Sequence, residues 1–154
     1  MNAGFPVAVT AAAGKPHKGG YDTPESVVAT AEYAEDFIAS FSINYAAMRY
    51  NLRNDQLNHL DGDKARMDIG RENLRVYLQG EEDKPAVEKT SVRGFGYATD
   101  LHVRNFLECI RTRRTPTATM AIAFQAALVV QLANLSLRSG RRMKWNSAEQ
   151  KVGA

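Results

Sequence analysis

The stretch MAIAFQAALVVQLANLSLRSG, residues 120–140, decides the fold. Residues 120–137 are apolar almost all round a helix and approach the length of a membrane span. Four polar residues interrupt this run: Gln125, Gln131, Asn134 and Ser136. Amide side chains without hydrogen-bond partners are costly inside a lipid bilayer, which argues against a membrane span. We therefore interpret the segment as a buried helix of a globular protein, packed between a sheet and another helix.

The ends of this helix carry recognisable capping residues. Thr117 or Thr119 can act as the N-cap, and Gly140 fits the position just after the last turn. Spacing predicts a buried stripe made of Phe124, Leu128, Leu132 and Leu135. Gln131 and Asn134 are expected at the less buried edge of the helix.

A shorter helix is predicted over residues about 100–114. Its apolar positions are Val103, Phe106, Leu107 and Ile110, with Thr99 or Asp100 as the N-cap. Pro116 ends it, because the residue before a proline is disfavoured in the α region. Both helices finish in arginines: Arg111, Arg113 and Arg114 after the first, and Arg138, Arg141 and Arg142 after the second. Cations there complement the helix dipole, which explains them without nucleic acid.

The preceding residues, about 5–78, predict strands. DFIASFSINYA, residues 36–46, alternates between a mainly apolar and a mainly polar face, which is typical of an antiparallel sheet packed on one side. DGDKARMD, residues 61–68, is interpreted as a hairpin turn. Residues about 79–98 are expected to form an exposed loop, and residues about 141–146 a final strand. The predicted fold is α+β: an open-faced, mainly antiparallel sheet covered on one side by two C-terminal helices, in a single domain 1–154.

Composition limits the classes of protein. The chain has 154 residues and a net charge of +3, which combines −4 over residues 1–100 with +7 over residues 101–154. Such asymmetry hints at nucleic-acid binding, but no aromatic side chains interleave with the arginines as single-strand binding would require. One cysteine, Cys109, excludes an internal disulfide and a thiolate metal cluster. We expect a cytoplasmic protein, with neither nucleic acid nor membrane as a partner.

Few residues point to chemistry. The sequence has no GxGxxG and no GxxxxGK[ST] phosphate loop, and no EF-hand loop develops from residues 61–68. His17, His59 and His102 are too far apart in sequence to form a local metal pair, so no metal site and no catalytic residue are predicted. His102, in the first turn of its expected helix, is the candidate substrate-binding residue; the alternative is a surface or capping histidine.

Several segments together resemble one enzyme family. HVRNFLECIRTRRTPTATM and the long helix lead to Gly140, Arg141, Trp145 and Asn146, which match a G-R-x-x-x-W-[DN] strand. YDTPESVVATAEYAEDFIASFSINY and GDKARMDIGRENLRVY precede them. In this order they resemble the C-terminal domain of glucose–fructose oxidoreductase/inositol dehydrogenase (Gfo/Idh/MocA) proteins, over nearly the whole chain.

The resemblance implies part of an NAD(P)-dependent sugar or polyol oxidoreductase, namely its substrate-binding and oligomerisation domain. The family's Rossmann domain and its E-K-P lysine are not found; Lys84, in EDKP, follows no βαβ unit and is not assigned that role. We therefore expect a truncated or split form that is not catalytically complete alone and binds no cofactor itself. Its expected partners are further copies of the chain, through the open sheet face, and a Rossmann-domain chain. The alternative is a free-standing, non-enzymatic, homo-oligomeric binding domain.

Overall fold

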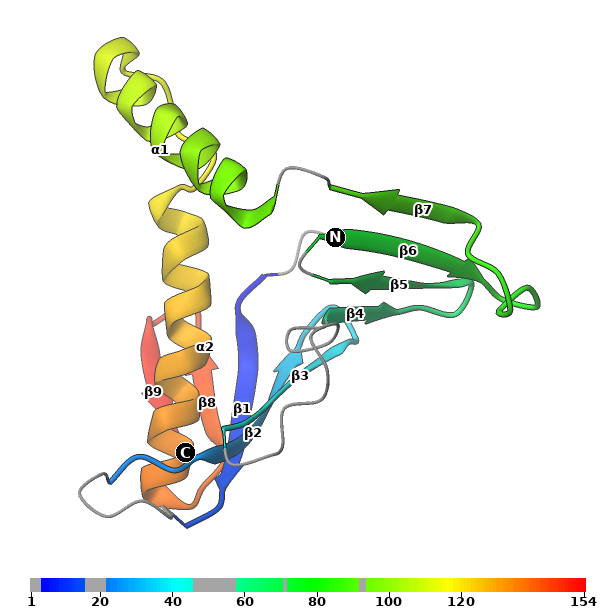
Figure 1. Cartoon of the computed structure of the whole chain (residues 1–154). Coiled ribbons are helices and arrows are strands. Elements are labelled where there is room, and N and C mark those ends of the chain that lie inside the picture. The colour runs from blue at the N-terminus through cyan, green and yellow to red at the C-terminus, as the bar shows by residue number, and fades with distance from the viewer. Residues whose placement is uncertain (1–3, 16–21, 46–57, 71, 92–93) are drawn as a thin grey trace. The chain divides into compact units, whose positions relative to one another are not determined.

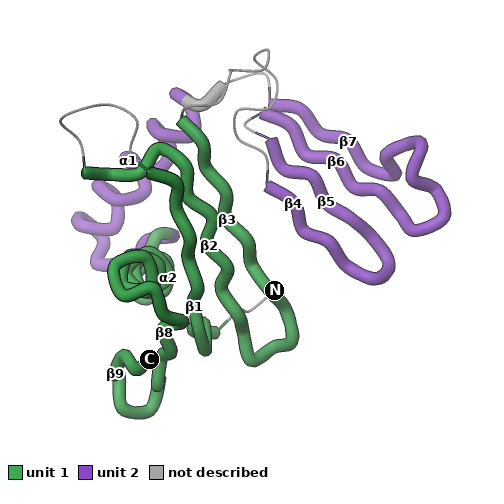
Figure 2. Tube along the Cα trace, turned by 90° about the horizontal axis from the view of Figure 1, so that it is seen from below, with its two compact units in different colours: residues 1–47, 118–154 green, residues 48–117 purple. Residues whose placement is uncertain are grey.

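The computed structural model describes residues 4–15, 22–45, 58–70, 72–91 and 94–154. They form two antiparallel sheets and two helices, so the predicted α+β class is confirmed. The chain divides into two compact units, residues 1–47 with 118–154 and residues 48–117 (Figure 2). The second unit is thus inserted between the two segments of the first.

The first unit contains a five-stranded sheet and one helix (Figure 1). Strand order is β3-β2-β1-β8-β9, and every neighbouring pair is antiparallel. The elements are β1 (Pro6–Ala13), β2 (Ser26–Tyr33), β3 (Ile38–Asn44), β8 (Met143–Asn146), β9 (Lys151–Gly153) and α2 (Met120–Ser139).

Helix α2 lies along β1 and β8 and closes the hydrophobic core of this unit (Figure 1). The buried cluster consists of Val9, Ala31, Leu128, Leu132 and Met143. Leu128, Leu132 and Ser136 are the buried residues of α2, spaced four apart on one helix face. This confirms the central part of the predicted stripe and the exposure of Gln131 and Asn134.

The ends of the predicted stripe are wrong. Phe124 is 46% exposed and Leu135 is 41% exposed. The sheet contacts only one face of α2. Leu135 lies about 60° round the helix from Leu132, so its side chain is outside that contact. Phe124 instead meets Phe5 and Trp145 at the margin of the core, with ring centroids 5.6 and 6.3 Å away.

The capping predictions for α2 hold. Thr119 is the N-cap, and its side-chain oxygen accepts a hydrogen bond from the backbone N–H of Ile122. Gly140 has φ +65°, and its N–H donates to the Ser136 carbonyl at 2.8 Å. The left-handed conformation explains the glycine, because other residues adopt it only with strain.

Strand register settles which face of β3 lies on the helix side. Ala31, in the core with α2, is opposite Ala39, and Ala29 is opposite Phe41. Cross-strand partners point to the same face, so Phe41 faces the α2 side. It is nevertheless 57% exposed, because α2 packs over β1 and β8 and leaves β3 uncovered.

The second unit contains a four-stranded antiparallel meander, in the order β4-β5-β6-β7, and helix α1. The elements are β4 (Asn58–Asp61), β5 (Ala65–Ile69), β6 (Asn73–Leu78), β7 (Val87–Thr90) and α1 (Gly94–Thr112). The expected hairpin at residues 61–68 is present, with Asp61 opposite Arg66 and the Gly62 N–H donating to the Ala65 carbonyl.

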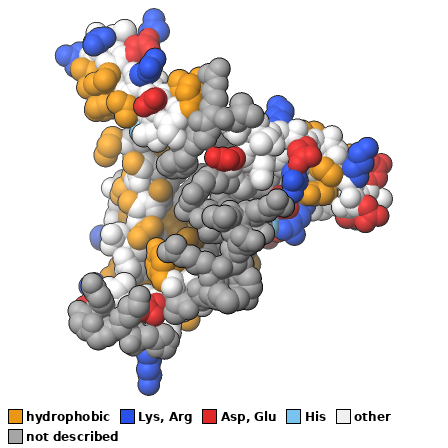
Figure 3. Space-filling model, in the orientation of Figure 1, with side chains coloured by type: hydrophobic (Ala, Val, Ile, Leu, Met, Phe, Trp, Pro, Cys, Tyr) orange, Lys and Arg blue, Asp and Glu red, His pale blue; other side chains and the backbone are white. Residues whose placement is uncertain are grey.

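Helix α1 begins at Gly94, six residues before the expected start, so Thr99 and Asp100 lie inside the helix and not at its cap. Gly94 and Gly96, which lie within the expected loop, are therefore part of the helix, where glycine is unfavourable but tolerated. Val103, Phe106, Leu107 and Ile110 remain about half exposed, and Figure 3 shows hydrophobic side chains over both helices. The two helices belong to different units, so the structure has two sheets in units with one helix each, where the prediction had one sheet covered by both helices.

Other details also differ from the predictions. The strands form two sheets and not one, β7 lies within the expected loop, and β9 was not predicted. Arg142, which was expected to complement the helix dipole, forms a bidentate pair with Glu32 through its guanidinium, at 2.8 and 2.6 Å. Alternation of side chains identifies strands but not their order, which is why the division into two sheets was missed.

One helix among the described residues, α2, is long and apolar enough to cross a membrane by length and composition alone. Only 17% of its most apolar window is buried. Its contact with β1 and β8 nevertheless shows that one face serves as part of a protein core.

Candidate functional site

The four-stranded sheet has one strongly charged face. Strand register places His59 opposite Asp68, Asp68 opposite Arg75, and Arg75 opposite Glu88. Basic and acidic residues thus alternate from β4 to β7, and Arg75 Nε donates to Glu88 Oε1 at 2.7 Å. Opposite charges on directly paired residues stabilise a given register, so this row helps fix the order and alignment of the strands.

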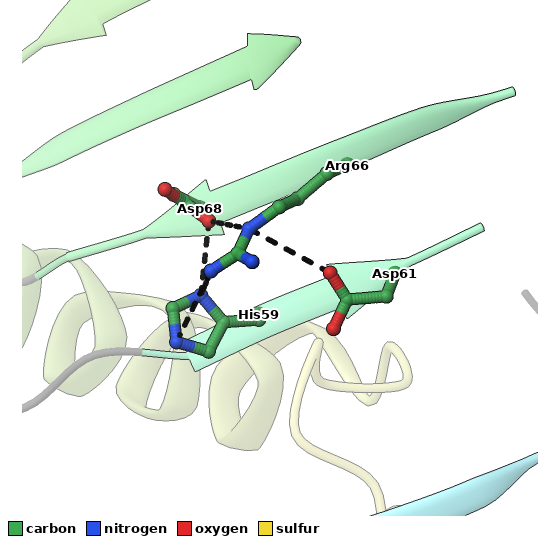
Figure 4. Close-up of polar contacts among 4 residues, drawn as sticks. All are labelled: His59, Asp61, Arg66 and Asp68. Carbon is green, nitrogen blue, oxygen red and sulfur yellow. Dashed lines mark hydrogen bonds and ion pairs between the residues drawn. The ribbon is translucent and has the colours of Figure 1, made fainter. Parts of the chain in front are cut away.

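Four side chains of this charged face form a cluster on the β4–β5 hairpin (Figure 4). We call His59, Asp61, Arg66 and Asp68 the charged cluster. Arg66 Nε donates to Asp68 Oδ1 at 2.7 Å, and Arg66 Nη2 lies 2.6 Å from His59 Nδ1. Asp61 Oδ1 is 3.6 Å from Arg66 Nε, a looser ion pair. Alternation along the strands puts all four on one face.

His59 lies between two other members of the cluster. Its Nδ1 is 2.6 Å from Arg66 Nη2 and 2.9 Å from Asp68 Oδ1, and its Nε2 is 3.5 Å from Arg66 Nη2. With its proton on Nδ1 the ring donates to Asp68 and can accept from Arg66 at Nε2, and with its proton on Nε2 the ring accepts from Arg66 at Nδ1. The imidazole therefore bridges the carboxylate and the guanidinium.

The cluster keeps Asp68 ionised. The hydrogen bond from Arg66, and secondarily the contact with His59, holds the pKa of Asp68 below its ordinary value. Asp68 raises the pKa of Arg66 in turn. An ionised carboxylate between two donors accepts hydrogen bonds and is unsuited to donate a proton as a general acid. The cluster is therefore equipped for binding polar groups or a complementary surface.

The opposite face of this sheet is apolar. Leu60, Met67, Val76 and Val87 lie in one cross-strand row from β4 to β7. Leu60 and Val87, at the two ends, are 48% and 42% exposed. The sheet is thus amphipathic, with a charged face and an apolar face.

The predicted binding residue His102 lies on α1, and its side chain is exposed. Within the described residues it has no hydrogen bond or ion pair to the charged cluster. His17 lies outside the described residues. No group of three or more His, Cys, Asp or Glu side chains that could hold a metal ion occurs in the described part of the chain.

The sequence interpretation missed the charged cluster. It assigned residues 61–68 to a turn and considered His59 only as a metal ligand. The signal was present: His59 and Asp61 precede the turn at a spacing of two, and Arg66 and Asp68 follow it at the same spacing. In a hairpin, this pattern places four ionisable side chains on one face.

Comparison with known proteins gives no match to a family model and none to a curated protein sequence. Solved structures do match. Levoglucosan dehydrogenase in complex with NADH and levoglucosan is similar over 92% of this chain and 45% of its own, with a TM-score of 0.71 and 16% identity. An oxidoreductase from Agrobacterium radiobacter, in complex with NAD+, L-tartaric acid and magnesium, is similar over 92% of this chain and 44% of its own, with a TM-score of 0.70 and 12% identity.

A third structure is UDP-N-acetylglucosamine 3-dehydrogenase from Acidithiobacillus ferrooxidans, similar over 90% of this chain and 42% of its own, with a TM-score of 0.65 and 14% identity. The fold of this chain is similar to part of the fold of these three enzymes. At 12–16% identity the likeness establishes the fold alone. The chain spans less than half the length of these three structures.

Proposed function

We propose that this chain is the substrate-side and oligomerisation part of a Gfo/Idh/MocA-type, NAD(P)-dependent sugar or polyol oxidoreductase. The fold match carries the proposal: about nine-tenths of the chain corresponds to less than half of oxidoreductases whose structures contain NAD+ or NADH. The segments that resemble this family in sequence span the same length. The chain on its own does not complete the reaction.

The cofactor would be held elsewhere. Hydride transfer requires a nicotinamide held beside the substrate, and dinucleotide pyrophosphates are bound where a glycine-rich turn joins a strand to a helix. The sequence of this chain has no such turn. We expect it to contribute the substrate side, with a Rossmann-domain partner supplying NAD(P).

His102 is the residue we propose for substrate contact. It is exposed on α1, where an imidazole can exchange hydrogen bonds with the hydroxyl groups of a sugar or polyol. The residue lies on a helix, so its backbone is held rigidly even though its side chain is free to adapt.

Self-association would use the helix side of the five-stranded sheet where α2 leaves β3 uncovered, and not the open face expected from the sequence. On the helix side of β3, Phe41 is 57% exposed and Ile43 lies two residues further on the same face. Paired residues of the opposite face are more polar, as in the row Thr10, Thr30 and Ser40. Apolar area of this kind is normally covered, and we propose that a second copy covers it.

The remaining expectations concern environment. We propose a cytoplasmic protein that binds neither nucleic acid nor membrane. The apolar length of α2 is explained by its packing against β1 and β8, and Arg111 and Arg138 lie in the last turns of the helices.

Titration calorimetry tests the cofactor and substrate assignments together. The chain is titrated with NAD+, NADH and NADP+, and separately with levoglucosan, L-tartrate and UDP-N-acetylglucosamine. We expect binding of at least one carbohydrate or hydroxy acid and no heat from the dinucleotides. His102→Ala should weaken the carbohydrate affinity, whereas Glu108→Gln, an exposed change on another side of α1, should not.

Micromolar dinucleotide binding would contradict the assignment of this chain to the substrate side. Carbohydrate binding combined with no hydride transfer after addition of a family Rossmann domain would favour the free-standing binding domain. Light scattering tests assembly: Phe41→Asp should dissociate the oligomer, and Ile38→Asp, on the opposite face and 67% exposed, should leave it intact.

A further inference from the structure

Strand β4 is an edge of the four-stranded sheet (Figure 1). No strand among the described residues pairs with its outer side. In an antiparallel pair, hydrogen-bonded and non-bonded residue pairs alternate. The Gly62 N–H donates to the Ala65 carbonyl, so Leu60 and Met67 form the next bonded pair. The backbone groups of His59 and Asp61 therefore point outward.

We propose that β4 pairs antiparallel with β4 of a second copy of the chain, about a two-fold axis at Leu60. In this register His59 of one copy is opposite Asp61 of the other, and the same pair recurs on the far side of the axis. Both residues present outward N–H and C=O groups, so the two pairs form four backbone hydrogen bonds. Leu60 is opposite its own counterpart in the non-bonded position.

Charge selects this register. An imidazole can donate a hydrogen bond to a carboxylate, and the side chain of Asp61 is 68% exposed. Pairing about Leu60 places the His59 imidazole of one copy opposite the Asp61 carboxylate of the other, and it does so twice. Moving the axis to His59 would oppose two imidazoles, and moving it to Asp61 would oppose two carboxylates. Side-chain alternation excludes the odd registers, which would mix the two faces.

The apolar face supports the same register. Leu60 ends the row Leu60–Met67–Val76–Val87. Pairing about Leu60 joins the rows of two copies end to end into one continuous apolar row on a single face. The charged rows on the other face meet His59 to Asp61, so both faces stay continuous across the axis.

The opposite edge lacks this complementarity. Strand β7 has the sequence VEKT, and self-pairing about Glu88 or Lys89 would oppose like charges. Edge charges generally prevent unwanted strand pairing. On β4 they permit one partner, a second β4, and this makes β7 the natural control.

Disulfide trapping tests the pairing. In a Cys109→Ser background, which removes the single native thiol, Leu60→Cys is compared with Val87→Cys. The two positions lie in one row with similar exposure, 48% and 42%. Non-bonded antiparallel partners have Cα atoms about 4.5 Å apart, which is within disulfide range. We expect the Leu60→Cys protein to form a covalent dimer at least tenfold faster than the Val87→Cys protein.

A charge change provides a second measurement. Adding Asp61→Lys to the Leu60→Cys protein should slow dimer formation at least tenfold, because an ammonium group would then replace the carboxylate that faces His59. Asp63→Lys, the same change of charge in the turn beyond β4, should have a smaller effect. Circular dichroism of the reduced proteins checks that each variant folds.

Equal trapping rates at positions 60 and 87, or no effect of Asp61→Lys, would overturn the proposal. The test is independent of the sheet-face interface proposed above. Phe41→Asp should leave disulfide formation at position 60 unchanged, so failure of one interface is distinguishable from failure of the other.

Discussion

The side-chain oxygen of Ser136 accepts a hydrogen bond from the backbone N–H of Ala11, at 3.0 Å. Strand β8 pairs with β1 only at Ala8 and Val9. After Val9, no strand among the described residues pairs with this side of β1. Ser136 is 1% exposed and lies on the buried face of α2. The hydroxyl thus continues the hydrogen bonding of β1 where β8 ends.

Ser136→Ala should lower the free energy of unfolding by about 1–3 kcal/mol, because it leaves a part-buried N–H without an acceptor. Urea denaturation measures the loss, and hydrogen exchange should show faster exchange specifically at Ala11. Ser139→Ala is the control: its hydroxyl bonds the Leu135 carbonyl of its own helix, so Ala11 should stay protected. Unchanged exchange at Ala11 in Ser136→Ala would contradict the assignment.

Leu132→Ala tests where the core lies. Leu132 is 0% exposed, so its truncation should cost about 2–5 kcal/mol. Val130 lies on the outer side of the same helix and is 58% exposed, and Val130→Ala should change stability by no more than about 0.5 kcal/mol. Similar thermal midpoints for both variants would mean that α2 does not pack as described.

Phe124→Ala should have an intermediate effect, about 1–2 kcal/mol, because Phe124 is half exposed but contacts two aromatic rings. Trp145 is the single tryptophan and reports on this site. Its Nε1 is buried and has no hydrogen-bond partner among the described residues. Removing Phe124 should admit water there and shift the fluorescence emission to the red. An unshifted spectrum would argue against this aromatic contact.

Gly140→Ala should destabilise the protein by about 1 kcal/mol through backbone strain alone, since φ is +65°. A Cβ at this position would meet no atom within 4 Å, so no steric clash contributes. Gly153 also has open space but no left-handed φ, and Gly153→Ala is therefore the matched control. Thermal melting should show a lower midpoint for Gly140→Ala than for Gly153→Ala, because only the first substitution strains the backbone.

The Glu32–Arg142 pair should make stability depend on pH. The hydrogen bond from Arg142 holds the pKa of Glu32 below 4.5, the ordinary value. The contribution is present above the unfolded-state pKa and is lost as pH falls through the lower folded-state pKa. Wild type should exceed Glu32→Gln in urea midpoint at pH 7, and the two should converge below pH 4.5.

Glu149→Gln is a suitable comparison, because Glu149 pairs with Lys151 only at 3.8 Å. It should alter the urea midpoint at pH 7 less than Glu32→Gln does. A constant difference between wild type and Glu32→Gln from pH 3 to pH 7 would exclude the ion pair as its source.

Local signals in the sequence were sufficient for α2 and the hairpins. Thr119 and Gly140 lie at the helix ends because capping depends on neighbouring backbone groups. The alternation in β3 and the turn at residues 61–68 likewise depend on nearby residues. These features were predicted correctly for the reasons given.

Features that depend on distant residues were not predictable. Arg142 is 110 residues from Glu32, and no local pattern pairs them. The apolar period of α2 did not reveal that the sheet covers only one of its faces, so Phe124 and Leu135 were placed wrongly. The alternation of ionisable residues in the charged cluster can be seen in the sequence. The contacts that Arg66 makes, however, could be predicted only with knowledge of the register between β4 and β5.

The insertion of residues 48–117 within the first unit also affects the order of folding. The meander of β4–β7 pairs residues that are close along the chain, so it closes only short loops. The core of the first unit must bring Val9 to Leu132 and Met143, across more than a hundred residues. Because rates fall as contacts become less local, we expect the inserted meander to form early and the first unit to close last. A chain emerging from the ribosome would have to keep β1 unaggregated until α2 has been synthesised.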